Sequence, residues 1–276
     1  MNYEEKVLVY IDILGFTDAV DDTVRCSDCK NLVKCIDCKK IGKYSILKKK
    51  EIPNKIDEID NLFDEEHFHI KYRDCLTGDK YKIKGKITSQ FSDSIVISYP
   101  NIEDIYLILL NVYLLCVMAL EKGFLYRGAV VYGKVIHTDN KLFGPAFLKA
   151  YEIEQKQALF PRIIIDDNIF DIVKKFYSEC ADPDSENNNL LELIPFDFDG
   201  KRYINYVDKL YTGVGVGIME EQKHLAWVYE IIRKMNISDD SIKCKYLWLK
   251  EKYDIALEKY EKNLLENKNS PIGEQE

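Results

Sequence analysis

The segments YIDILGF (residues 10–16) and QFSDSIVIS (residues 90–98) decide how this chain folds. Each places one carboxylate, Asp12 or Asp93, in an apolar run that is typical of a buried strand. A buried carboxylate is costly unless a cation or a hydrogen-bond donor compensates it. The two segments therefore predict neighbouring strands whose acids share one divalent-metal site. Two aspartates that accept hydrogen bonds from nearby backbone amides are the structural alternative.

The remaining elements extend outward from these two strands. The first strand is expected over Lys6–Ile13, with a tight turn at Gly15, and the second over Thr88–Ser98, where a hairpin that carries Asp93 is possible. The apolar run Ile105–Leu120 is shorter than the roughly 20 residues that cross a bilayer, so it predicts a buried core helix. Further strands are expected over 124–137 and 163–166, and further helices from 146 and over 167–177, 220–235 and 241–266. This order predicts an α+β fold with a ferredoxin-like βαββαβ core.

The length, the net charge and the N-terminal residues indicate an intracellular protein of one main domain. The chain has 276 residues and a net charge of −8, from 39 Lys and Arg against 47 Asp and Glu, which disfavours general nucleic-acid binding. The polar start, MNYEEK, is unlike a signal peptide, so a cytoplasmic location without a membrane span is expected. We expect a catalytic domain over 1–215 and a helical C-terminal extension over 216–276, ending in a disordered tail. An apolar stripe in this extension predicts a packing or dimer face (Tyr246, Leu247, Leu249, Tyr253, Leu257, Tyr260 and Leu264).

An insertion over residues 24–42 carries two CxxC pairs separated by five residues (Cys26, Cys29, Cys35 and Cys38). Four thiolates so close together can hold one structural Zn²⁺ tetrahedrally, and they would leave no open position for catalysis. The spacer is shorter than in the common zinc patterns, so a surface insertion with incidental cysteines is the alternative.

The two aspartates also suggest a chemistry. Asp12 and Asp93 can together hold two Mn²⁺ or Mg²⁺ ions, which prefer oxygen ligands, and Ile13 can add its backbone carbonyl to one of them. Gly15 and the neighbouring peptides can offer N–H groups to a phosphate. Two metal ions beside phosphate oxygens are the arrangement for in-line attack on phosphorus.

Four segments resemble class III nucleotidyl cyclases in the right order. YIDILGF and FSDSIVIS are similar to their two metal motifs, YRGAVVYGKV to the strand pair that follows, and LFGPAFLKAYEIEQ to the helix that closes the active site across the dimer. The likeness covers roughly residues 6 to 166. It implies a class III cyclase core in a homodimer, with Asp12, Ile13 and Asp93 as metal ligands.

The departures from that family narrow the expected substrate. The lysine that reads adenine falls at Ser89, the purine-reading aspartate falls at Pro145, and the residues that read guanine are missing as well. The pattern RGA…GPA…AYEIE…PRI resembles the pyrimidine cyclases of bacterial Pycsar antiphage systems. That resemblance implies conversion of UTP to 3′,5′-cyclic UMP and pyrophosphate, a messenger that activates an effector. CTP and cyclic CMP are the alternative.

The substrate contacts are less clearly indicated. The ribose and transition-state positions of many class III cyclases fall at Leu148 and Glu152, so the cation that neutralises phosphate is open among Arg127, Lys149 and Arg162. Phe16 and Tyr151 are candidates to border the base, and aromatic residues are also common in cores. A cyclase-like dimer that binds nucleotide without turnover is a rival hypothesis. A diguanylate cyclase or polymerase palm ranks low, because Ser92-Asp93-Ser94 replaces the GG[DE]EF signature.

Overall fold

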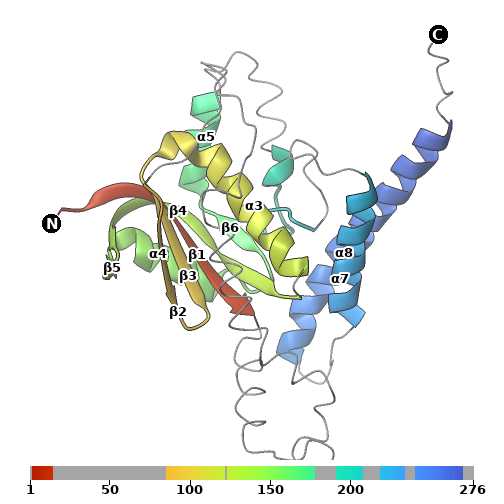
Figure 1. The fold of residues 1–276 in the computed structure, drawn as a ribbon, viewed down its shortest axis with the longest axis horizontal. Helices are drawn as coiled ribbons and strands as arrows, with labels where there is room; N and C mark the ends of the chain where they lie inside the picture. The colour runs from red at the N-terminus through yellow and green to blue at the C-terminus, as the bar shows by residue number, and fades with distance from the viewer. Residues whose placement is uncertain are drawn as a thin grey trace, which may run out of the picture.

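The fold was analysed in a computed structural model that describes residues 2–14, 85–121, 123–177, 191–207, 218–233 and 240–269. Its centre is a mixed seven-stranded sheet of order β2-β3-β1-β4-β6-β7, with β5 paired to β4 (Figure 1). The strands are β1 (Glu4–Leu14), β2 (Ile87–Phe91), β3 (Ser94–Tyr99), β4 (Leu125–Thr138), β5 (Lys141–Phe143), β6 (Ile163–Ile165) and β7 (Arg202–Tyr203). The helices are η1 (Ile102–Asp104), α3 (Ile105–Glu121), α4 (Pro145–Lys156), α5 (Asp167–Tyr177), α7 (Ile218–Arg233) and α8 (Asp240–Asn269). The predicted mixed α+β architecture is thus confirmed.

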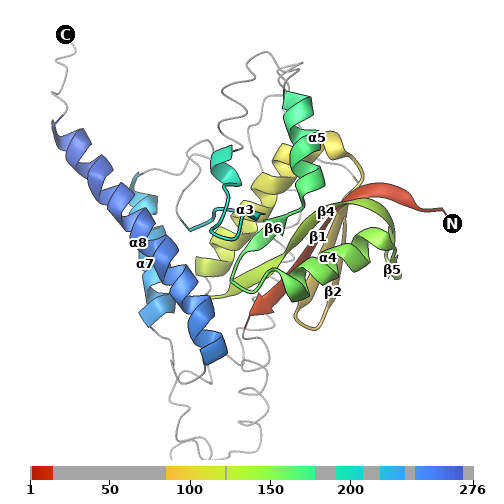
Figure 2. The same cartoon turned by 180° about the vertical axis from the view of Figure 1, so that it is seen from behind.

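Strand β1 divides the hydrophobic core into two layers. Its side chains alternate between the two faces of the sheet, so Val7, Val9 and Ile11 pack with α3, whereas Leu8 and Tyr10 pack with α4. Helix α3 lies in front of the sheet in Figure 1, and α4 lies in front of it in the reverse view of Figure 2. Asp12 follows the same alternation as Tyr10, so its carboxylate belongs to the face that α4 covers.

The second predicted strand is a hairpin in the structure. The stretch Thr88–Ser98, expected as a strand with a possible hairpin, is divided into β2 and β3 by a two-residue turn at Ser92 and Asp93, and Phe91 pairs with Ser94 across it. Ser92 adopts a positive φ of 58°, which two-residue hairpin turns require at one or both central residues. The alternation of the sequence predicted extended backbone correctly but did not locate the reversal.

Helix α3 is a core helix. Within the described residues, one helical stretch, Ile102–Leu120, is long and apolar enough to cross a membrane, and 67% of its apolar window is buried inside the protein. Its residues belong to the larger hydrophobic cluster with the sheet. This packing is the one expected for the core helix of a soluble protein, as predicted from the length of the apolar run.

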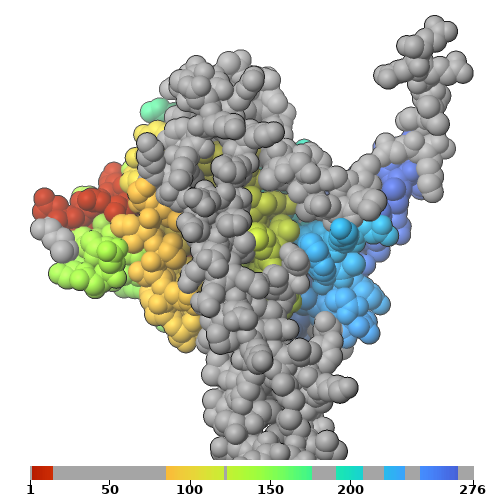
Figure 3. All heavy atoms as spheres, viewed as in Figure 1, coloured from red at the N-terminus to blue at the C-terminus, as the bar shows by residue number. Residues whose placement is uncertain are grey.

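The C-terminal extension is helical, as predicted, and it joins the main core. Trp248 and Leu249 of α8 are buried in the same cluster as β1 and α3, with Tyr246 and Tyr253 packed against it. Leu247, which the stripe had assigned to the same face, is 54% exposed. Figure 3 shows α7 at the surface on the side of the molecule opposite the β2–β3 hairpin.

Candidate active site at the ends of strands β1 and β3

The structure brings Asp12 and Asp93 together at one edge of the sheet. Strands β1 and β3 are antiparallel, and Asp12 is the Cα partner of Ser94, the residue directly after Asp93. The backbone N–H of Ile13 donates a hydrogen bond of 2.9 Å to the carbonyl oxygen of Asp93. The β2–β3 turn therefore holds Asp93 beside the end of β1.

The same pairing orients the backbone of Ile13. In a strand, the N–H and C=O of one residue point to the same side. Because the Ile13 N–H points to Asp93, the Ile13 carbonyl oxygen also points toward the β2–β3 turn. This is the orientation needed for the predicted metal contact of Ile13.

A third carboxylate reaches these strand ends from helix α4, which covers the face of the sheet where the Asp12 side chain lies. Arg127 of β4 donates its Nε–H to Oδ2 of Asp12 at 2.8 Å, and its Nη2 lies 2.8 Å from Oε1 of Glu154 on α4. Glu154 is completely buried, and its Oε1 accepts no hydrogen bond, since the contact with Arg127 is an ion pair without hydrogen-bond angles. We call Asp12, Asp93 and Glu154 the carboxylate cluster.

The cluster carries more negative charge than its surroundings neutralise. Burial raises the pKa of Asp12, and the Arg127 hydrogen bond and charge only partly oppose that rise, while Asp93 adds to it. Burial also raises the pKa of Glu154, with contributions from Asp12 and Asp93 in the same direction. The charges of the three acids therefore act on one another, and a divalent cation would relieve both their repulsion and their desolvation.

The donor set fits Mn²⁺ or Mg²⁺. It consists of three carboxylates and a backbone carbonyl, and these hard oxygen ligands are the ones such ions prefer. Oε1 of Glu154 already lies 2.8 Å from the Arg127 guanidinium, so a metal ion bound to it would take the place of that contact. Among the described residues, no three His, Cys, Asp or Glu side chains are already grouped for a metal ion. A divalent ion bound by this set would compete with Arg127 for the Asp12 carboxylate.

Glu154 is the residue of this cluster that we did not predict from the sequence. The spacing of residues along α4 could have indicated it, because Glu154 lies on the buried face of this helix with Ala146, Ala150 and Ile153. A charged residue on the buried face of an amphipathic helix indicates a partner on the opposite element. That partner, Arg127, is 27 positions away in the sequence.

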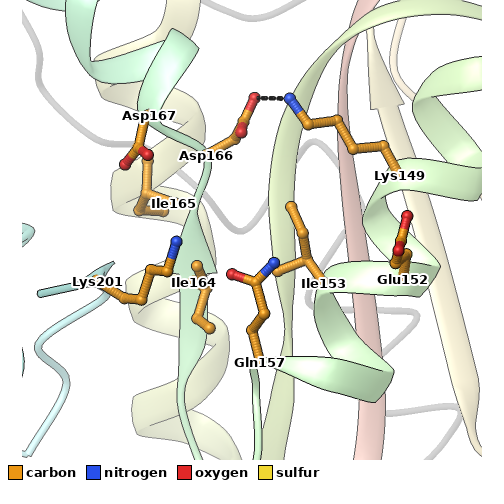
Figure 4. Close-up of a pocket in the computed structure, with 9 residues that line it drawn as sticks. All are labelled: Lys149, Glu152, Ile153, Gln157, Ile164, Ile165, Asp166, Asp167 and Lys201. Atoms are coloured by element: carbon orange, nitrogen blue, oxygen red, sulfur yellow. Dashed lines mark hydrogen bonds and ion pairs between the residues drawn. The ribbon is translucent and has the colours of Figure 1, made fainter. Parts of the chain in front are cut away.

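Lys149 is in a separate pocket. This pocket has a volume of about 230 Å³ and lies between α4, the end of β6 and Lys201. Nζ of Lys149 binds Oδ2 of Asp166 at 2.6 Å at one end of the pocket, and Lys201 approaches from the opposite side (Figure 4). Glu152 also lines this pocket rather than the carboxylate cluster. Lys149 therefore has a carboxylate partner, and its predicted contact with substrate remains a prediction.

Arg162 is a structural residue in this fold. Its side chain is completely buried and forms ion pairs with Asp197 and Asp199, so it is not accessible to a phosphate. Of the other predicted site residues, Gly15 and Phe16 lie outside the described residues. The four cysteines of the predicted zinc site lie outside them as well (Cys26, Cys29, Cys35 and Cys38).

Comparisons with known proteins do not assign the chain to a family. No protein-family model matches the sequence, and a search of curated proteins found no significant match.

Proposed function

We propose that this protein is a nucleotidyl cyclase that converts UTP to 3′,5′-cyclic UMP and pyrophosphate, on a class III cyclase core. The observation that carries the proposal is the convergence of Asp12, Asp93 and the Ile13 carbonyl at the ends of two paired strands. The resemblance of the motifs assigns these groups to metal binding, and their juxtaposition supports that assignment. The buried Glu154 supplies an additional acidic oxygen at the same edge.

The reaction is an intramolecular transfer at phosphorus. The ribose 3′-oxygen bonds to the α-phosphorus, the bond from that phosphorus to the β-phosphate oxygen breaks, and the 3′-hydroxyl proton leaves to solvent. Bound Mn²⁺ or Mg²⁺ would lower the pKa of the hydroxyl and neutralise the departing pyrophosphate. The protein's part is to fix Asp12 and Asp93 at the ends of paired strands, which positions the reacting groups.

The surroundings of Ser89 support a substrate other than ATP. Ser89 occupies the position where adenylate-making relatives resembled by this chain carry lysine, and its hydroxyl is hydrogen-bonded to Nε2 of His137 at 2.9 Å. The other ring nitrogen of His137 is bonded to Ser98 at 2.9 Å. A neutral, internally bonded serine offers no cation to a purine. At the other purine-reading position, Pro145 begins α4, and its side chain has no oxygen to accept a hydrogen bond from a base.

Helix α4 supports a homodimer. Leu148 and Tyr151 on its outer face are 65% and 46% exposed. In the cyclases that this segment resembles, the corresponding helix closes the site across the dimer. An apolar surface on this helix is what such an interface needs.

The biological setting follows from the same resemblance. We propose that the protein acts in the cytoplasm during phage infection and that cyclic UMP activates an effector protein. The possible structural Zn²⁺ site in the insertion belongs to this proposal as a stabilising element, and zinc analysis of the purified protein with Cys26→Ser as a comparison tests it.

Product analysis tests the enzymatic proposal. The protein is incubated with each of ATP, GTP, CTP and UTP and with Mn²⁺, and the nucleotides are separated chromatographically. We expect cyclic UMP from UTP, loss of product in Asp12→Asn and Asp93→Asn, and unchanged turnover in Asp139→Asn, which alters an exposed acid in the β4–β5 turn. If cyclic CMP is the main product, the proposed substrate is CTP and not UTP. If the folded, dimeric protein forms no cyclic product from any of the four nucleotides, the proposed enzymatic activity is refuted.

One observation favours a second candidate, a nucleotide-binding dimer without turnover. Asp12 is already paired with Arg127, so a divalent ion competes with an internal cation for its carboxylate. In that case UTP would bind, with the same affinity in the presence and absence of Mn²⁺, and no product would form. Calorimetric titration of UTP with and without Mn²⁺ separates the two candidates.

A further inference from the structure

Arg127 joins two carboxylates that differ in their exposure to solvent. Its guanidinium lies 2.8 Å from Asp12 through Nε and 2.8 Å from Glu154 through Nη2. The Glu154 side chain is fully buried, whereas that of Asp12 is 13% exposed and that of Arg127 is 20% exposed. Asp93 is also partly exposed. An ion that arrives from solvent can therefore reach Asp12 and Asp93, whereas Glu154 presents no surface to it while Arg127 stays in place.

Both carboxylate oxygens of Glu154 already have side-chain partners. Oε1 faces Nη2 of Arg127, and Oε2 accepts a hydrogen bond of 2.7 Å from Nε2 of Gln155. If a metal ion bound both Asp12 and Glu154, the Arg127 guanidinium would keep neither of its ion-pair partners. A charge that loses its partner in a largely buried place is strongly destabilising, so this arrangement is unfavourable.

Glu154 allows Arg127 to release Asp12 while it keeps one partner. The contact with Glu154 uses Nη2, and the hydrogen bond to Asp12 uses the Nε–H, so one can break while the other persists. A divalent ion that binds Asp12 therefore has to replace one contact of Arg127 and not both. The ionised Arg127–Glu154 pair that remains is neutral as a whole, so it does not repel the ion.

We propose that Glu154 is a positioning residue, which holds Arg127 when a divalent ion takes the Asp12 carboxylate and thereby sets how tightly Asp12 and Asp93 bind that ion. The inference rests on the proposed function for the presence of the ion. Without the ion, Arg127 bridges both acids and acts as the cation at Asp12. With the ion, Arg127 stays on Glu154.

A charge-balanced double substitution tests this role. Mn²⁺ is titrated into the full-length protein without nucleotide, and free Mn²⁺ is measured by electron paramagnetic resonance. Arg127→Met/Glu154→Gln removes one positive and one negative charge, so the net charge around Asp12 and Asp93 is the same as in the wild type. We expect this variant to bind Mn²⁺ about tenfold more tightly, because Asp12 no longer accepts a charge-assisted hydrogen bond.

The single variant Glu154→Gln should have the opposite effect. It leaves Asp12 as the one acid paired with Arg127, so we expect Mn²⁺ binding to weaken by about tenfold or more. Glu230→Gln is the matched control, because Glu230 is an exposed glutamate that is also paired with an arginine, Arg233. Its Mn²⁺ affinity should stay within about twofold of the wild type.

Thermal unfolding in metal-free buffer checks that each variant is folded. The double variant removes both charges of the buried pair, which proteins tolerate better than the loss of one. It therefore tests the role of Glu154 even if Glu154→Gln alone does not fold.

The outcomes separate this inference from the proposed function. Weaker Mn²⁺ binding by the folded double variant than by the wild type would overturn the inference, because it would identify Glu154 as a metal ligand. Equal binding would overturn it as well, because Arg127 would then not compete with the ion. If the wild type binds no Mn²⁺, the inference and the proposed metal site both fail. If Mn²⁺ binding follows the expected pattern and no cyclic product forms, the role of Glu154 is supported and the cyclase is refuted.

Discussion

Arg127 donates its Nε–H to Oδ2 of Asp12 at 2.8 Å, across the β1–β4 pair. The same guanidinium contacts Glu154, so one cation holds two buried acids from different layers of the fold. The arrangement has two consequences. It stabilises the folded state without metal, and it places an internal cation in competition with a divalent ion.

Replacing Arg127 should make stability depend on metal. Arg127→Met leaves Asp12 and Glu154 buried without their cation, so we expect the free energy of unfolding to fall by about 3 kcal/mol in metal-free buffer. Millimolar Mn²⁺ should restore much of that loss, because the carboxylates can then hold the ion. Urea denaturation with and without Mn²⁺ measures both effects. Arg233→Met, which removes an exposed ion pair with Glu230, is the control and should change little. A variant that Mn²⁺ does not stabilise would argue against a metal site here.

Gly128 should not tolerate a side chain. A Cβ at this position would lie 2.0 Å from the backbone oxygen of Tyr10, so Gly128→Ala must separate β4 from β1 beside Asp12. We expect a loss of about 3 kcal/mol or more in the free energy of unfolding. Gly133→Ala, on the same strand, meets Ala146 at an ordinary 3.6 Å and should be nearly neutral. Equal stability of the two variants by chemical denaturation would show that the strand pairing is looser than described.

Stability should fall in mildly acidic solution because of buried histidines. Burial lowers the pKa of His137 to about 4, with the charge of Lys6 acting in the same direction. The unfolded chain therefore takes up a proton between pH 6.5 and about 4, while the folded chain does not. The free energy of unfolding should decrease as the pH falls through this interval, by at most about 3 kcal/mol for this group.

The variant His137→Gln isolates this contribution. Glutamine cannot titrate, so the slope of stability against pH should be smaller in the variant than in the wild type. Some slope should remain, because burial also lowers the pKa of His224 to about 4. Urea denaturation across this pH range provides the measurement, and identical slopes for the two proteins would contradict the assignment.

A charge on the outer face of α4 should disrupt the proposed dimer. Leu148→Glu places a carboxylate at the centre of the expected interface, where it would be desolvated without a partner. We expect a shift toward monomer in sedimentation experiments, with loss of cyclase activity. Leu265→Glu is a suitable control, because Leu265 is 62% exposed on α8 away from that helix. If the Leu148→Glu variant remains dimeric, the outer face of α4 is not the dimer interface.

The strands near the site could be predicted because their residue patterns are local. Alternation and β-branched residues located β1 and β3, and the placement of an acid near the end of each run indicated that Asp12 and Asp93 meet. A hairpin at Asp93 was predicted as a possibility, but the turn could not be located at Ser92, because serine rarely adopts a positive φ.

The contacts across layers could not be predicted in this way. The ion pair of Arg127 with Glu154 and the hydrogen bond of Trp248 to Asp197 depend on the positions in which the helices pack. The hydrophobic periodicity of the sequence does not predict those positions. The apolar stripe of α8 identified Leu249 correctly but assigned Leu247 to the same face, since it took no account of the polar anchors.

The anchoring of α8 on Asp197 also bears on synthesis of the protein. The ribosome makes β1, β3, β4 and α4 well before it reaches Trp248 and Lys252. Until those two residues emerge, the buried Asp197 carboxylate has the Arg162 guanidinium and the backbone N–H of Phe198 as its partners. A nascent or prematurely terminated chain can therefore contain the whole carboxylate cluster while it lacks Trp248 and Lys252. Full stabilisation of the buried Asp197 carboxylate is thereby tied to synthesis of α8.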